Sequence, residues 1–129
     1  MAPRRRKIRV AAAAYPFDPP GSFGGWGAKI GHWVADAAGK KAELLVFPEY
    51  GAMELAATGR PELATDIPVS LKVVAELAAE ADKVWAGLAQ RHKVHILAGG
   101  GPRVCDDGLM RNISAFFAPS GAFALQEKM

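Results

Sequence analysis

The clearest pattern in the chain is a run of four apolar residues, Leu44 to Phe47, with a charged residue before it and a proline after it. A short apolar run of this kind is typical of a strand buried on both faces, as in the parallel sheet of an α/β protein. Pro48 has no N–H with which to continue the ladder, so we expect the strand to end there. Glu49 then lies at the carboxyl end of a buried strand, the edge where open α/β sheets bind ligands. Because most strand-end glutamates are solvated loop residues, a functional role for Glu49 needs further evidence from the rest of the chain.

Periodic apolar positions predict further elements on both sides of this strand. A first strand is expected near residues 7–14. The β-branched Ile8 and Val10 near its start and the Tyr15-Pro16 stop favour strand, although the alanines within it favour helix. Apolar residues on one helical face predict a helix that Ser22 caps and Gly39 terminates. A second, longer helix is expected from Pro68, in its first turn, to about His92.

The middle of the chain completes a second strand and helix unit. A short helix is expected over 49–57, and a third buried strand over 94–98. The glycine and proline segment at 99–102 is expected to break that strand. Strand, helix, strand in this order predicts a parallel α/β core, with the two long amphipathic helices covering one face of the sheet.

The last quarter of the chain predicts antiparallel strands instead. Residues 103–105 and 109–118 form a pair joined at Asp106-Asp107-Gly108, a hairpin turn signal. A second turn leads to a final strand at 122–126. Two strand and helix units followed by such a meander are not a complete doubly wound fold, and we therefore expect the chain to be incomplete.

Composition and charge narrow the class of protein. The chain has 129 residues, half of them hydrophobic, which fits one domain with a real core and excludes disorder. The basic run at 4–7 carries most of the net charge of +3 and is read as a solvated tail, because no basic stripe with interleaved aromatics follows to bind nucleic acid. No stretch is apolar enough to span a membrane or to act as a secretion signal, and a single cysteine excludes an internal disulfide. A cytoplasmic protein that binds neither nucleic acid nor membrane is expected.

The triple glycine and the histidines are better explained by structural roles than by phosphate or metal binding. Gly99-Gly100-Gly101 lacks the Lys and Ser/Thr of a phosphate-binding loop, so a turn is expected. The three histidines, His32, His92 and His95, have no ligand spacing with a carboxylate between them, so we expect no metal site and no cofactor.

Three further residues could carry chemistry. Cys105 is followed by two aspartates that disfavour a thiolate, so it is expected to be a surface hairpin residue and not a nucleophile. Asn112 lies within an apolar strand and must find hydrogen-bond partners if buried, which favours a structural bridge. Lys128 follows an apolar strand, as Glu49 does, although a lysine so near a chain end is usually solvated.

Taken together, four segments resemble the nitrilase (carbon–nitrogen hydrolase) superfamily. Residues 45–50, Leu-Val-Phe-Pro-Glu-Tyr, look like the glutamate motif of that family. Residues 111–115 with 119–121 resemble the paired strands before its lysine motif, and residues 126–129 resemble the lysine motif itself. Residues 7–12 are similar to its first strand, so the resemblance covers the whole chain in the right order.

This resemblance implies an αββα sandwich, present here as an incomplete N-terminal half, so that residues 1–129 are a partial carbon–nitrogen hydrolase domain. It implies Glu49 as general base and Lys128 as the stabiliser of the tetrahedral intermediate. The cysteine nucleophile of the family lies beyond the lysine motif, whereas this sequence stops at Met129 and Cys105 precedes Lys128. The chain therefore holds no nucleophile that matches the family, and it is expected to be inactive alone.

The chemistry is consistent without the family name. A thiol needs a base within reach, a carboxylate in an apolar pocket has a raised pKa that suits this task, and an ammonium stabilises the oxyanion. We therefore expect the side chains of Glu49 and Lys128 to converge at one strand-end pocket.

The expected function of the full-length protein is hydrolysis of carbon–nitrogen bonds in small amides or nitriles, by a homo-oligomer when complete. The alternative is a non-catalytic nitrilase-like module that binds a partner or completes a sandwich in trans. A third hypothesis, a nucleotide-binding α/β protein, is disfavoured because no glycine fingerprint follows the first strand.

Overall fold

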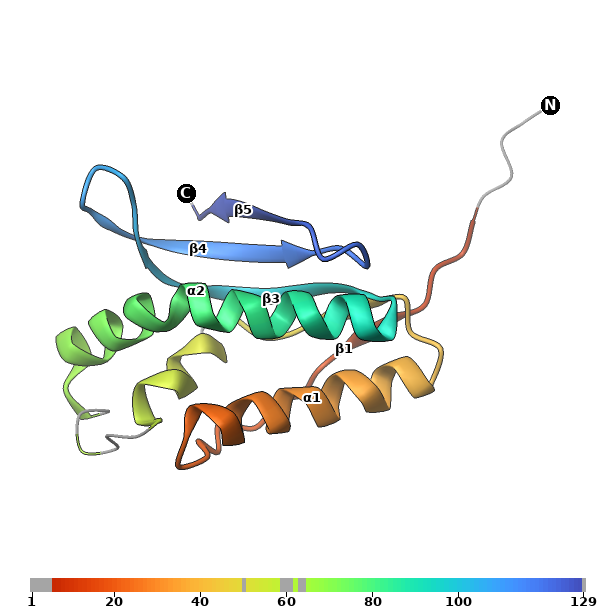
Figure 1. The fold of residues 1–129 in the computed structure, drawn as a ribbon, viewed down its shortest axis with the longest axis horizontal. Coiled ribbons are helices and arrows are strands. Elements are labelled where there is room, and N and C mark those ends of the chain that lie inside the picture. The colour runs from red at the N-terminus through yellow and green to blue at the C-terminus, as the bar shows by residue number, and fades with distance from the viewer. Residues whose placement is uncertain (1–5, 50, 59–61, 63–64, 129) are drawn as a thin grey trace.

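The computed structural model describes residues 6–49, 51–58, 62 and 65–128 (Figure 1). Its elements in chain order are β1 (Val10–Ala12), α1 (Phe23–Gly39), β2 (Leu44–Val46), the 3-10 helix η1 (Gly51–Ala57), α2 (Ile67–His92), β3 (His95–Val104), β4 (Met110–Phe117) and β5 (Phe123–Glu127). The α/β class predicted from the hydrophobic pattern is thus confirmed.

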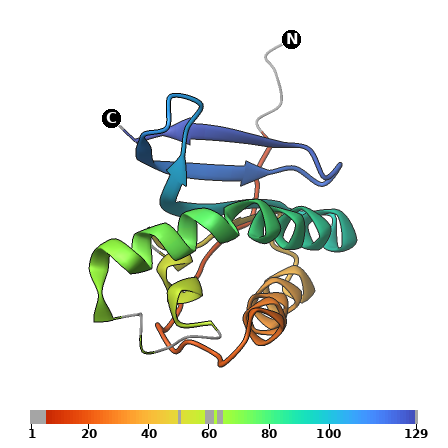
Figure 2. The same cartoon turned by 60° about the vertical axis from the view of Figure 1, so that its left-hand side comes forward.

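The strands form one five-stranded sheet in the order β1-β2-β3-β4-β5. β1, β2 and β3 run parallel, and β3, β4 and β5 are antiparallel neighbours. Leu45 pairs with Ala11 on one side and with Ile96 on the other, which places the predicted apolar strand in the interior of the sheet. Both long helices lie on the same face of the sheet, as expected (Figures 1 and 2).

The helix ends follow the local chemistry only partly as predicted. Ser22 caps α1 by accepting a hydrogen bond from the Gly25 N–H at 3.0 Å, as expected. Gly39 is predicted to end the helix from just outside it, and this is wrong by two positions. Gly39 is the last helical residue, and Lys41 takes the left-handed conformation with φ of 68°. α2 has its proline in the first turn as predicted, and its cap, Asp66, accepts from the Val69 N–H at 3.1 Å.

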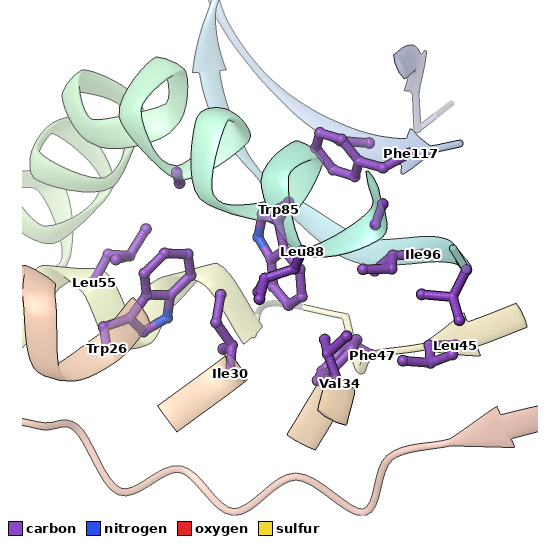
Figure 3. Packing of buried hydrophobic residues seen from close by; sticks show 14 of the residues in the cluster. Trp26, Ile30, Val34, Leu45, Phe47, Leu55, Trp85, Leu88, Ile96 and Phe117 are labelled. Carbon is purple, nitrogen blue, oxygen red and sulfur yellow. The ribbon is translucent and has the colours of Figure 1, made fainter. Parts of the chain in front are cut away.

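The core lies between the two helices and the sheet (Figure 3). The ring of Phe47, at the end of β2, packs edge-on against Trp85 of α2 at 4.8 Å between centroids. Trp26 of α1 contacts the same tryptophan at 5.9 Å. Each large side chain buried in this way contributes about 1.5–3 kcal/mol. This aromatic cluster fixes the chain just after β2, two residues before Glu49.

The predicted break of the third strand at 99–102 is wrong. β3 continues to Val104 through all three glycines, with an irregular register between Leu97 and Gly100. Gly99 has φ of 85°, and a Cβ there would lie 2.3 Å from the Pro48 carbonyl oxygen. The glycines therefore do not end the strand. They let one long strand bend and pass close to the Pro48–Glu49 turn.

Other boundaries are also shorter or different. The first strand covers Val10–Ala12 and not all of 7–14, and the short helix predicted from Glu49 is a 3-10 helix over Gly51–Ala57. The last two strands and their turns are confirmed, with Val104 paired to Met110 across the predicted hairpin.

The second face of the sheet carries apolar side chains away from the helices. Leu45, Ile96 and Phe117 are fully buried beneath the helices, so their neighbours along each strand point the other way. One such row crosses all five strands; it consists of Ala12, Val46, Leu97, Phe116 and Ala124. None of the helices in the described ranges is both long and apolar enough to cross a membrane.

We expect the purified chain to self-associate through this second face, because exposed apolar faces and open strand edges promote association. Phe116 of β4, the largest side chain in this row, is 38% exposed. Phe116→Ser should lower both the light-scattering mass and the binding of an apolar dye. Phe17→Ser, at a more exposed phenylalanine in the loop before α1, is the matched control and should change neither. A monomeric wild-type chain without dye binding would contradict the prediction.

Candidate active site

Glu49 lies in the turn between β2 and η1. The Phe47 N–H still donates to the Leu97 carbonyl at 2.9 Å, and the ladder ends at Pro48, as predicted. The Pro48 carbonyl then accepts from the Gly51 N–H at 3.2 Å, which begins η1. Glu49 is therefore held at the carboxyl end of the parallel strands.

Lys128 lies directly after β5 and extends the β4–β5 ladder by one position. Its N–H donates to the Asn112 carbonyl at 2.9 Å. Its ammonium group contacts Oε1 of Glu49, 79 positions earlier in the sequence. The structure thus brings together the two residues that sequence reasoning selected; their catalytic roles stay predictions.

Two glycines of β3 allow these distant segments to meet. Gly99 touches the Pro48 carbonyl, and Gly100 lies beneath the Asn112 side chain, where a Cβ would be 2.7 Å from Oδ1. The Nδ2 of Asn112 in turn lies 3.4 Å from Glu49 Oε1, at the long end of hydrogen-bond distances. The site is therefore built from the segments that follow β2 and β5, from the middle of β3 and from the beginning of β4.

The electrostatics of Glu49 differ from the expectation of a raised pKa in an apolar pocket. The pKa of Glu49 is lowered from its usual 4.5, chiefly by the hydrogen bond from Lys128; partial burial opposes this, and the Lys128 charge and Asn112 add to it. The side chains of Glu49 and Lys128 are 47% and 56% exposed. The expectation is wrong for this chain because the pair lies on an open rim, where the cation outweighs desolvation.

Lys128→Met is expected to raise the pKa of Glu49 towards 4.5, because it removes the main group that favours the carboxylate. In the wild type, the pair stabilises the fold above the unfolded pKa, and this contribution is lost as the pH falls through the lower folded pKa. The Glu49 carboxyl can be followed by carbon-13 NMR across a pH titration. Lys83→Met, in the exposed pair with Glu80, should leave the Glu49 titration unchanged. Identical curves for both variants would contradict the pairing.

The remaining candidates lie elsewhere. Cys105 is a free, partly buried thiol in the turn between β3 and β4. It lies three positions beyond Pro102, the partner of Asn112, or roughly 10 Å along the sheet. His95 stacks on Phe116 on the second face. Within the described part of the chain, no three His, Cys, Asp or Glu side chains gather to hold a metal ion.

A buried charged cluster around Glu54 of η1 was missed from the sequence. Glu54 of η1 is fully buried and accepts hydrogen bonds from the Tyr15 hydroxyl and the Lys29 ammonium, both at 2.6 Å, and from the Asp18 N–H at 3.1 Å. Lys29 also donates to the carbonyls of Pro16 and Asp18, each at 2.9 Å. Burial, followed by the hydrogen bond to Glu54, raises the pKa of Tyr15 above its usual range.

This cluster ties the loop after β1 to η1, the helix that follows Glu49 in the chain. The Tyr15 ring also packs edge-on against Phe47 at 5.9 Å between centroids. The one signal in the sequence was a glutamate directly before the apolar stretch Leu55–Ala57, which a buried 3-10 turn accommodates.

Solved structures that are similar to this chain include carbon–nitrogen hydrolases and amidases. The chain superposes on the carbon–nitrogen hydrolase from Helicobacter pylori G27 with a TM-score of 0.67 and 20% identity over 95% of this chain and 39% of that one. A mutant of the Nesterenkonia AN1 amidase from the nitrilase superfamily superposes with a TM-score of 0.64 and 17% identity, over 94% of this chain and 43% of that one. The C. elegans NitFhit protein superposes with a TM-score of 0.60 and 15% identity, over 95% of this chain and 27% of that one. No family model matches the sequence, and no curated protein matches it.

The chain therefore has the α/β fold found in part of carbon–nitrogen hydrolase structures, including members of the nitrilase superfamily. It spans about two fifths of the length of the first two of these structures.

Proposed function

We propose that this chain is part of an enzyme that hydrolyses carbon–nitrogen bonds in small amides or nitriles. Glu49 is the general base, Lys128 stabilises the oxyanion, and a cysteine outside residues 1–129 is the nucleophile. The contact between the Glu49 carboxylate and the Lys128 ammonium, on a fold shared with carbon–nitrogen hydrolases, is the observation that carries this proposal.

The two groups divide the work on an amide. Glu49 takes the thiol proton as sulfur attacks the carbonyl carbon, and the new oxyanion lies against the Lys128 ammonium. The tetrahedral intermediate collapses with loss of the C–N bond, and the proton on Glu49 passes to the leaving amine. Glu49 then takes a proton from water as the water oxygen attacks the thioester carbon. It returns this proton to the sulfur as the C–S bond breaks, which releases the carboxylic acid and restores the thiol.

The low pKa of Glu49 in the described chain bears on this chemistry, because a strongly paired carboxylate is a weak base. Covering the rim with substrate or a further layer of protein would desolvate Glu49 and raise its pKa. The present geometry supplies the placement of the two charges, and closure of the site supplies the basicity.

The test is the product of the complete reading frame. It should contain a cysteine after a strand that follows Lys128, and it should release ammonia from small amides or nitriles. Replacing that cysteine with serine should abolish release. A complete frame without such a cysteine would contradict the enzymatic proposal.

The 129-residue chain itself should release no ammonia, because its one thiol, Cys105, lies away from Glu49. Turnover by this chain that disappears in Cys105→Ser would contradict the assignment of the nucleophile. Turnover that persists in Cys105→Ser would contradict the expected inactivity of the chain.

A second function is supported by the apolar second face of the sheet, with Val10 51% exposed. In this alternative the chain is a non-catalytic module that completes a sandwich with a partner in trans. A stable stoichiometric complex that covers this face, combined with a complete frame lacking the cysteine, would favour the module over the enzyme.

A further inference from the structure

Asn112 of β4 touches both members of the Glu49–Lys128 pair. Its backbone carbonyl accepts from the Lys128 N–H at 2.9 Å. Its side-chain Nδ2 lies 3.4 Å from Glu49 Oε1, the oxygen that the Lys128 ammonium also contacts. The Asn112 side chain thus contacts Glu49, and its backbone carbonyl pairs with the segment that carries Lys128.

The orientation of the Asn112 carboxamide follows from its two ends, one over Gly100 and the other facing Glu49. Its Oδ1 is buried over Gly100 and has no hydrogen-bond partner within the described residues. A buried acceptor without a partner costs free energy. The opposite orientation would direct Oδ1 at the Glu49 carboxylate, so that two acceptors would face each other. In the observed orientation, Oδ1 stays unpaired and the Nδ2 N–H points at Glu49.

We propose that Asn112 is a positioning residue for the Glu49–Lys128 pair, an inference that rests on the proposed function of that pair. Both hydrogen bonds that the described residues give Glu49 end on Oε1. Asn112 and Lys128 hold this oxygen, and Oε2 is left as the oxygen that takes the proton. Gly100 contributes to this positioning, because any side chain there would displace the Asn112 carboxamide.

The first experiment follows Glu49 and needs no activity. Asn112→Leu keeps a similar shape but removes the donor, and we expect the Glu49 carboxyl to titrate at higher pH in carbon-13 NMR. Ser114→Ala is the matched control, since Ser114 lies on the same strand and face and pairs with Gly100. It should leave the Glu49 titration unchanged.

Hydrogen exchange at the Lys128 amide separates positioning from simple fraying of β5. This amide donates to the backbone carbonyl of position 112, so it should stay protected in Asn112→Leu if the ladder is intact. A protected Lys128 amide together with an unshifted Glu49 titration would overturn the proposal.

If Asn112→Leu frays the ladder, Asn112→Asp decides instead. It keeps the shape and polarity of the side chain but replaces the donor with an acceptor beside Glu49. We expect a larger upward shift of the Glu49 titration than in Asn112→Leu, and an unchanged titration would overturn the proposal.

In the complete protein, Asn112→Leu is expected to lower kcat by about 10²-fold with little change in KM, as for a misplaced reacting group. Unchanged kcat in a protein whose wild type is active would contradict the role of Asn112. If the wild type hydrolyses no amide or nitrile, the proposed function fails, and the Glu49 titration still decides whether Asn112 positions the pair.

Discussion

Glu54→Ala is expected to destabilise the fold by about 3–5 kcal/mol, because removing one partner of a buried ion pair leaves the other charge uncompensated. Glu54 is fully buried, and the Lys29 side chain opposite it is only 18% exposed. The substitution also leaves the Tyr15 hydroxyl and the Asp18 N–H without their acceptor. Urea unfolding followed by tryptophan fluorescence measures the loss.

Glu80→Ala is the matched control for this prediction. Glu80 also pairs with a lysine, Lys83, but both side chains are mostly exposed. Exposed pairs contribute about 0–1 kcal/mol, so the control should change stability little. Equal losses in the two variants would show that the Glu54 cluster does not hold the loop after β1 to η1.

Gly99→Ala is expected to cost about 3 kcal/mol or more and to displace the turn that carries Glu49. A residue with a side chain at positive φ costs about 1–3 kcal/mol from backbone strain. At Gly99 the added Cβ would also lie 2.3 Å from the Pro48 carbonyl oxygen, so backbone must move. The unfolding free energy measures the total, and the Glu49 titration reports the displacement.

Gly108→Ala separates strain from close approach. Gly108 has a similar φ of 78° but nothing within 4 Å of its added Cβ. It should show the strain alone and leave Glu49 unaffected. If Gly108→Ala is as destabilising as Gly99→Ala, the contact between β3 and Pro48 is not what requires glycine.

The sequence predicted the parts of the fold that depend on local pattern. The apolar run before Pro48, the Ser22 cap and the turn at Asp106-Asp107-Gly108 each specify their structure within a few residues. The same pattern located Glu49 at a strand end, and the family resemblance supplied Lys128 as its partner.

The features that were missed depend on contacts distant in sequence. The glycines at 99–101 indicate a turn when read locally, and only the approach of Pro48 explains why they belong to a strand. Glu54 reads as a surface residue until Lys29 and Tyr15 are placed around it. The low pKa of Glu49 follows chiefly from the hydrogen bond from Lys128, 79 positions away, which no local pattern reveals.

The most direct measurement of the proposed function is kcat for amide hydrolysis by the complete protein, compared between Glu49→Gln and Glu127→Gln. Glu127 is next to Lys128 in the sequence, is also exposed and is paired with Arg111, so it controls for loss of a carboxylate near the rim. Loss of a general base should lower kcat by about 10²–10⁴-fold in Glu49→Gln, while Glu127→Gln keeps the wild-type rate. Wild-type kcat in Glu49→Gln would contradict the proposal that Glu49 is the base.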